Sequence, residues 1–125
     1  MIDWKRFINF IERGNTTQLG ILITDTRIRL TQVRDDRGFT LLHHAVLKMK
    51  PDIVKFLIEY AFKKQDEDED ILQDWINAKT NKEKFTALHF AAFKGCLRSC
   101  YNLIDYGANL KLLNANGLTM LHLAA

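Results

Sequence analysis

The sequence contains four histidines and two cysteines, the side chains that most often bind zinc or act as a nucleophile with its base. Zinc sites in small domains use cysteine pairs with two residues between them, whereas Cys96 and Cys100 have three, and no second pair exists. Cys100 falls at a position expected to face a core, and Cys96 at a turn between helices. The sequence also lacks a nucleophile elbow, a phosphate-binding loop and a metalloprotease motif. We therefore expect no catalytic residue, no metal and no cofactor within residues 1–125.

Three of the four histidines stand in a repeated pattern. His43, His89 and His122 each follow a threonine by three residues and precede an alanine by two. The last two of these threonines are 33 residues apart and the first two are 46 apart, so one unit is longer by 13 residues. A threonine at a helix N-cap accepts a hydrogen bond from the backbone N–H three residues on. The pattern therefore predicts three helix starts, and it gives these histidines a structural role in the caps and between repeats.

This Thr-x-Leu-His-x-Ala pattern with a period of 33 resembles the ankyrin repeat, whose usual motif is Thr-Pro-Leu-His-x-Ala. The second unit carries more of the family pattern, with Gly95 nine residues after its threonine and Gly107 near its end. The resemblance implies an all-α solenoid of helix-turn-helix units with hairpin-like fingers. His44, which no motif position requires, is expected to face the groove of the solenoid or the solvent.

Departures from the family pattern concern the turns. Met49 takes the place that Gly95 has in the second unit, and Ala61 takes the place of Gly107. Because a side chain disfavours the left-handed backbone of such turns, we expect the turns of the first unit to be remodelled. Lys84 stands where the other two units have glycine, in a loop that is one residue longer. This predicts a distorted tip of the second finger.

The repeats divide the chain into four parts. We expect an N-terminal capping repeat at residues 1–34, ankyrin repeats at 35–80 and 81–113, and the start of a truncated repeat at 114–125. The sequence stops inside the first helix of the last repeat, where the partner helix would be needed to cover its apolar face. We therefore expect the sequence to be a fragment of a longer protein.

The extra residues of the first repeat fall at about 63–74 and are acidic. The run Asp66–Asp70 consists of carboxylates alone, and such a run repels itself. We expect it to form a solvated loop that extends the second helix. A cation site is the alternative, although the spacing of oxygen ligands is not that of an EF-hand loop.

The composition excludes several classes of protein. Of the 125 residues, 47% are hydrophobic and 26% are charged, close to the average for globular domains. No run of about 18 apolar residues could span a membrane, and the N-terminus lacks the layout of a signal peptide. Two cysteines cannot form a disulfide framework, so we expect a cytoplasmic location, or the cytoplasmic side of a membrane for a larger membrane protein. With a net charge of +3 and scattered lysines, we expect no nucleic acid and no membrane contact.

In ankyrin proteins the fingers and first helices form a concave groove that binds other proteins. The resemblance places groove residues at fixed positions around each motif, which here are Asp36, Arg37, Phe39, Leu47, Lys48, Lys82, Glu83, Phe85, Phe93, Lys94, Ala115, Asn116 and Leu118. Exposed rings at Phe39, Phe85 and Phe93 would be the aromatic anchors, because a few buried aromatics usually dominate an interface. The alternative is that these rings pack against neighbouring fingers.

The resemblance therefore implies a protein–protein interaction module that binds another protein in its groove and has no catalysis of its own. The alternative is that the segment is the N-terminal ankyrin array of a multidomain enzyme, such as a membrane palmitoyltransferase of the Asp-His-His-Cys type. Nothing in residues 1–125 distinguishes the two.

Overall fold

The computed structural model describes residues 2–124, and every regular element in that range is helical. The all-α fold predicted from the repeat is confirmed. The elements are α1 (Trp4–Arg13), α2 (Thr16–Thr26), α3 (Leu41–Leu47), α4 (Pro51–Glu59), the π-helix η1 (Tyr60–Lys64), α5 (Glu69–Ile76), α6 (Ala87–Lys94), α7 (Leu97–Asp105) and α8 (Met120–Ala124).

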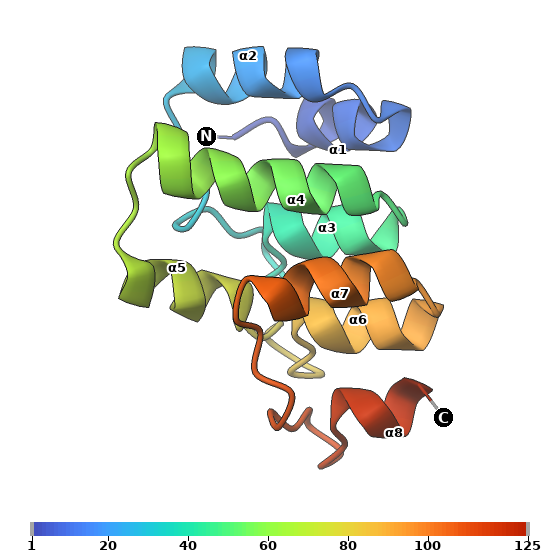
Figure 1. The fold of residues 1–125 in the computed structure, drawn as a ribbon. Helices are drawn as coiled ribbons and strands as arrows, with labels where there is room; N and C mark the ends of the chain where they lie inside the picture. The colour runs from blue at the N-terminus through green and yellow to red at the C-terminus, as the bar shows by residue number, and fades with distance from the viewer. Residues whose placement is uncertain (1, 125) are drawn as a thin grey trace.

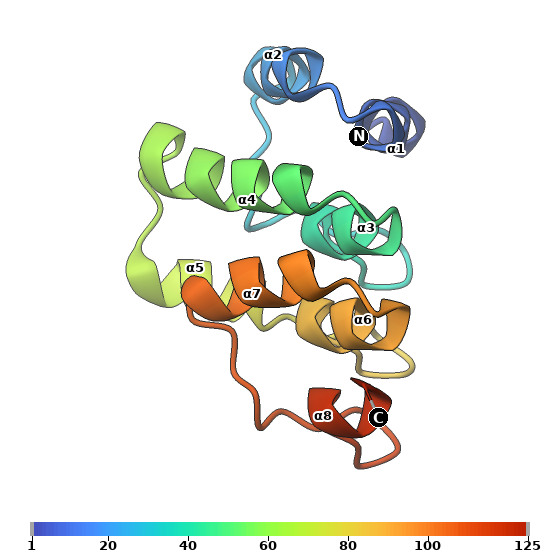
Figure 2. The ribbon, with the colours of Figure 1, turned by 45° about the vertical axis from the view of Figure 1, so that its right-hand side comes forward.

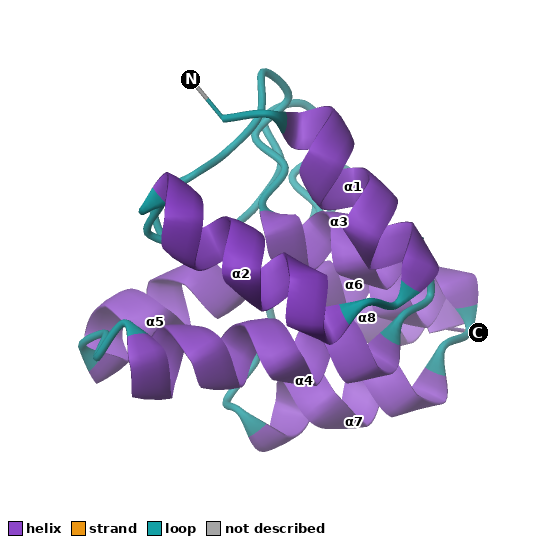
Figure 3. Cartoon of the chain, turned by 90° about the horizontal axis from the view of Figure 1, so that it is seen from above, coloured by secondary structure: helices purple, strands orange, loops and turns teal. Residues whose placement is uncertain are grey.

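The helices form two layers of a stack (Figure 1). In the inner layer α1, α3, α6 and α8 follow one another, and in the outer layer α2, α4 and α7 each pack on the inner helix that precedes them (Figure 2). Seen along the stack, the outer helices are displaced progressively to one side (Figure 3). We propose that the repeat boundaries after residues 34, 80 and 113 separate these helix pairs.

The inner helices begin where the repeated threonines predict. Thr40 and Thr86 are the N-caps of α3 and α6, and each accepts a hydrogen bond from the backbone N–H of the histidine three residues later. The ring Nδ1 of that histidine accepts the backbone N–H of the threonine in return, at 3.0 Å for His43 and 3.1 Å for His89. This reciprocal pair satisfies two backbone donors that a helix start would otherwise leave without a partner.

The turn after α3 is not remodelled, contrary to the expectation. Met49 adopts a left-handed φ of 57°, close to the φ of 71° at Gly95, and the same pair of hydrogen bonds closes the turn, one donated by Met49 and one by Lys50. Its N–H donates to Val46 O at 2.9 Å, as the N–H of Gly95 donates to Ala92 O at 3.1 Å. The closing hydrogen bonds outweigh a left-handed penalty of about 1–2 kcal/mol for a residue with a side chain.

The second finger differs from the others in length. The hydrogen bond that closes it runs from the N–H of Thr80 to Phe85 O, one residue further along than the bond from Asp35 to Phe39 O in the first finger. Lys84 takes a positive φ of 58°, as Gly38 does at 80°. The finger therefore keeps the left-handed residue of its neighbours and holds the additional residue in a longer turn.

The acidic segment is solvated at Asp66, Asp68, Glu69 and Asp70, as its charge predicts, but it is not a loop throughout. The π-helix η1 continues α4 to Lys64, and α5 begins at Glu69 with the carboxylate of Asp68 as its N-cap. Glu67 between them is 8% exposed, because its carboxylate accepts hydrogen bonds from Arg29 at 2.9 Å and Thr31 at 2.8 Å. The apolar residues of α5 at helical spacing then pack inward, namely Leu72, Trp75 and Ile76.

One hydrophobic core extends through the whole stack. The inner helices lie at its centre, and six of the seven residues of α3 and six of the eight of α6 are buried. Ala45 and Ala91 are fully buried and allow these helices to approach their neighbours closely. Among the residues described, none of the helices combines the length and apolar character needed to traverse a bilayer.

Candidate functional site

The face that the resemblance predicts to be a groove, called the concave face below, is bounded on one side by three fingers, residues 31–39, 77–85 and 109–118. Backbone hydrogen bonds join each finger to the next. The N–H of Asn81 donates to Arg37 O at 2.9 Å, and the N–H of Ala115 donates to Glu83 O at 2.9 Å. The side-chain amide of Asn81 also donates to Asp36 O at 3.2 Å. The finger backbones are therefore fixed relative to one another before any partner arrives.

Five of the predicted groove residues line a single pocket between the first two fingers. Its volume is about 300 Å³, and Thr80 and Asn81 complete its wall. The guanidinium of Arg37 lies over the ring of Phe39, 4.5 Å from its centre, which holds this cation at the pocket. The five are Asp36, Arg37, Phe39, Lys82 and Glu83.

The expectation of an exposed ring is wrong for Phe39. This ring is 8% exposed and packs against Phe90 of the next repeat at 5.6 Å between ring centres. Phe85 is half-buried and packs on the same Phe90 at 4.8 Å. Both rings therefore join the fingers to α6, and not to a neighbouring finger as the alternative interpretation proposed. Phe93 alone of the three is well exposed, at 63%.

The remaining groove residues lie at two places. Leu47, Lys48, Phe93 and Lys94 lie at the C-terminal ends of α3 and α6, where Lys48 pairs with Glu12 of α1 at 2.8 Å. Ala115, Asn116 and Leu118 belong to the third finger, the first two exposed and the last half-buried. The predicted residues thus form two edges on either side of the buried inner helices.

Each motif histidine joins its own helix cap to the following finger. With Nδ1 of His43 accepting from Thr40, Nε2 carries the proton and donates to Ala78 O and Phe85 O, both at 3.1 Å. His89 donates in the same way to Leu118 O of the third finger at 3.1 Å. Burial lowers the pKa of His43 to about 4, and it also lowers the pKa of His89. Both rings are therefore neutral at physiological pH.

His44 does not face the groove or the solvent, and this expectation is wrong. Its ring is buried between Trp4 and Phe39, and its Nε2 lies 3.0 Å from Asp35 Oδ2. Burial lowers the pKa of His44, and the hydrogen bond to Asp35 opposes that change. For Asp35, burial acts to raise the pKa, but hydrogen bonds from the Phe39 N–H, His44 and the Arg37 N–H together lower it. The hydrogen-bonded pair of His44 and Asp35 holds the first finger against α3.

Both cysteines belong to the helix α7 or its cap. Cys96 is the half-buried N-cap of α7, with its sulfur 3.3 Å from Ser99 Oγ, and Cys100 is buried in the core. Burial raises the pKa of the Cys100 thiol, which keeps it in the unreactive protonated form. Within residues 2–124 no three His, Cys, Asp or Glu side chains are grouped so that they could hold a metal ion.

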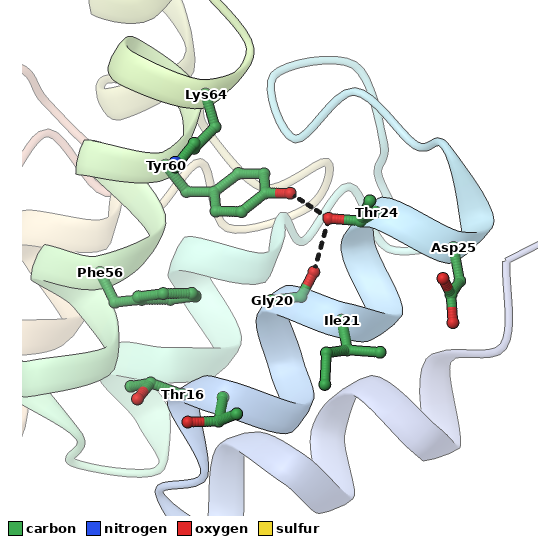
Figure 4. A pocket seen from close by; sticks show the side chains of 9 residues that line it. Thr16, Gly20, Ile21, Thr24, Asp25, Phe56, Tyr60 and Lys64 are labelled. Carbon is green, nitrogen blue, oxygen red and sulfur yellow. Dashed lines mark hydrogen bonds between the residues drawn. The ribbon is translucent and has the colours of Figure 1, made fainter.

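Sequence reasoning missed a hollow of about 480 Å³ in the outer layer, between α2 and α4 (Figure 4). Ile21 and Phe56 line it, and the hydroxyl of Tyr60 lies 2.5 Å from that of Thr24 across it. Gly20 faces Phe56 so closely that a Cβ there would lie 3.3 Å from the ring. The one signal in the sequence is this glycine in the interior of a helix, where glycine is unfavourable without a packing reason.

Comparison with known proteins identifies the family. The ankyrin-repeat signature matches residues 37–64 and 83–115. The chain belongs to the ankyrin-repeat family. The resemblance seen in the Thr-x-Leu-His-x-Ala motifs is thereby confirmed.

Two relatives of this ankyrin chain are the NF-kappa-B p105 subunits of Gallus gallus and Rattus norvegicus, each 32% identical over 96 residues. That alignment covers 77% of this chain and 9% of either relative. In structure, the chain is similar to one in the crystal structure of the yeast ribosomal protein Rps3 in complex with its chaperone Yar1, with a TM-score of 0.83 at 23% identity. The match covers 99% of this chain and 85% of the other, and it supports the ankyrin solenoid as the fold.

Proposed function

We propose that the chain is a protein–protein interaction module whose concave face binds a segment of another protein. The observation that carries the proposal is the exposed ring of Phe93, which lies at the C-terminal end of the inner helix α6, on the edge of this face opposite the fingers. A large aromatic ring exposed on a rigid surface is typical of residues that dominate binding energy once a partner covers them. We propose that Phe93 on one edge and the finger pocket around Arg37 and Lys82 on the other are the two anchor points of the interface.

The rigidity of the face supports this proposal. The hydrogen bonds between fingers and the histidine bridges hold the backbone in place, so little conformational entropy is lost when a partner binds. The finger turns expose side chains of several types at fixed spacing, which suits recognition of an irregular protein surface.

The comparisons support the coarser statement that the chain is built from repeats of a protein-binding family, which in general has no catalysis. The similar solved structure is of a complex between two proteins, as its description says. We propose a cytoplasmic location as well, which both free cysteines support because such thiols persist in reducing compartments.

Photocrosslinking tests the proposed function. A photoreactive amino acid replaces Phe93 on the concave face, and a second variant carries it at Lys55 on the exposed side of α4. In cells that express the protein, we expect defined protein adducts from the Phe93 position that are lost when an unmodified chain is present in excess. The same adducts from both positions, or adducts from Lys55 alone, would contradict a concave interface.

A further inference from the structure

The charged residues are divided unequally between the two sides of the molecule. The three fingers contain six arginines and lysines and three carboxylates. The opposite edge, at the ends of α1, α3 and α6, adds four cations (Arg13, Lys48, Lys50 and Lys94) and one carboxylate, Glu12. The concave face is therefore bounded by positive charge on both edges.

The outer layer has the opposite charge. Residues 16–30, 51–76 and 97–108, which form α2, α4, η1, α5, α7 and their connections, contain ten carboxylates and six cations. The net charge of +3 for the whole chain conceals this separation. Summed charge of this kind directs the approach of a charged partner towards the face of opposite sign.

Two of the four carboxylates on the concave side, Asp35 and Glu12, are already engaged. Asp35 accepts the backbone N–H groups of Arg37 and Phe39 and bonds to His44, so it is directed into the finger rather than towards a partner. Glu12 pairs with Lys48. Lys82 and Lys84, in contrast, are exposed at the tip of the second finger.

We infer that the concave face selects an acidic protein segment, one with Asp or Glu side chains along the fingers and an apolar side chain against Phe93. This inference rests on the proposed function and names the chemistry of its partner. Charge complementarity carries it: cationic fingers form one edge, and cations surround the exposed ring of Phe93 at the other edge.

A single-stranded nucleic acid would also be attracted by positive charge, but it requires a series of exposed rings on which bases stack. Among the three predicted groove rings, all within the described part of the chain, only Phe93 is well exposed, since Phe39 and Phe85 pack against Phe90. The spacing of cations and rings therefore favours a peptide over a polynucleotide.

Binding of labelled synthetic probes tests the inference. Three peptides of equal length, each with one tryptophan, carry Glu, Gln or Lys at the same positions, and a single-stranded oligonucleotide of equal length is the fourth probe. Affinities are measured by fluorescence anisotropy for the unmodified chain and three variants. These are Lys82→Glu with Lys84→Glu on the fingers, Lys55→Glu with Lys63→Glu on the outer layer as a control of equal charge change, and Phe93→Ala.

We expect the Glu peptide to bind about tenfold more tightly than the Gln peptide, with the difference decreasing at high salt. The affinity of the finger variant for the Glu peptide falls about tenfold, and the affinity of the outer-layer variant falls less than about twofold. Circular dichroism confirms that each variant is folded.

Three results would overturn the inference: no binding of the Glu peptide, equal binding of the Glu and Gln peptides, or oligonucleotide binding as tight as that of the Glu peptide. If Phe93→Ala lowers the affinity for the Gln peptide while the finger variant changes no affinity, the concave interface is supported and only its selectivity for acidic segments is contradicted. If neither Phe93→Ala nor the finger variant changes any affinity, the proposed function fails as well.

Discussion

The Nε2 atom of His43 lies 3.1 Å from the backbone oxygen of Phe85, the residue that closes the next finger. On the other side of the ring, Nδ1 accepts the backbone N–H of Thr40. One neutral imidazole therefore joins the start of its own helix to the following repeat, and its two nitrogens have no capacity left for a metal or for proton transfer.

The first prediction concerns the stability of the folded chain at low pH. The pKa of His43 is about 4 in the folded chain and 6.5 as a free side chain, so the unfolded chain takes up this proton first as the pH falls. The contribution of His43 to the free energy of unfolding is fully present above pH 6.5, and it decreases by about 3 kcal/mol as the pH falls to about 4. Urea unfolding across this range measures it.

The variant His43→Ala should lower the free energy of unfolding at neutral pH by about 1–3 kcal/mol and reduce its dependence on pH. His122→Ala is the control, because the ring of His122 is exposed. An unchanged pH dependence in His43→Ala would show that another group takes up the proton.

The second prediction compares two glycines with similar backbone angles. Gly38 and Gly117 have φ of 80° and 74°, but a Cβ at Gly38 would lie 2.4 Å from Asn81 Oδ1 and 2.9 Å from the Asn81 backbone N, whereas nothing lies within 4 Å at Gly117. Gly117→Ala should cost about 1–2 kcal/mol for the left-handed backbone. Gly38→Ala should cost about 1–3 kcal/mol more, because it separates the fingers. Equal melting temperatures for the two variants would contradict the close contact.

The third prediction concerns the acidic segment. Glu67→Ala leaves Arg29 and Thr31 without their acceptor and should destabilise the chain by about 1–3 kcal/mol. Asp74→Ala, an exposed carboxylate on α5, should change stability by less than about 0.5 kcal/mol. Deletion of residues 63–74 should also destabilise, since it removes the end of η1 and six of the eight residues of α5. Chemical denaturation of the three variants distinguishes these contacts from a dispensable loop.

The fourth prediction concerns self-association. Leu97, Tyr101 and Ile104 lie at helical spacing on the exposed side of α7, with Leu97 66% and Tyr101 62% exposed. A continuous apolar stripe of this kind favours association. Sedimentation velocity should show oligomers of the 125-residue chain that Tyr101→Lys with Ile104→Lys disperses and that Ile21→Lys on α2 does not. A monomer at all concentrations would contradict the prediction.

The sequence predicted the local features well. Helix starts, the structural role of His43 and His89 and the glycine turn after α6 follow from capping chemistry over a few residues, and the repeat places them in register. Features set by distant contacts were not accessible in this way. Phe39 is buried because Phe90, about fifty residues later, covers it, and His44 is buried because Trp4 does.

The acidic segment is a second case in which contacts between distant residues could not be predicted from the sequence. Its charge dominates the composition and predicts a solvated loop, while Leu72, Trp75 and Ile76 carry a helical pattern just beyond it. Only the fold places Arg29 and Thr31 where they compensate the charge of Glu67. For the candidate site, the family resemblance selected five residues that line one pocket but did not reveal which rings are covered.

The histidine bridges also determine which parts of the chain open together. If the second finger separated from the stack together with α6 and α7, Nε2 of His43 would lose both of its acceptors, Ala78 O and Phe85 O, while the ring remained on α3. That cost links the local unfolding of one repeat to that of the repeat before it. Amide protons of α3 and α6 should therefore exchange with solvent at similar rates, through a shared opening event, although the two helices are far apart in the sequence.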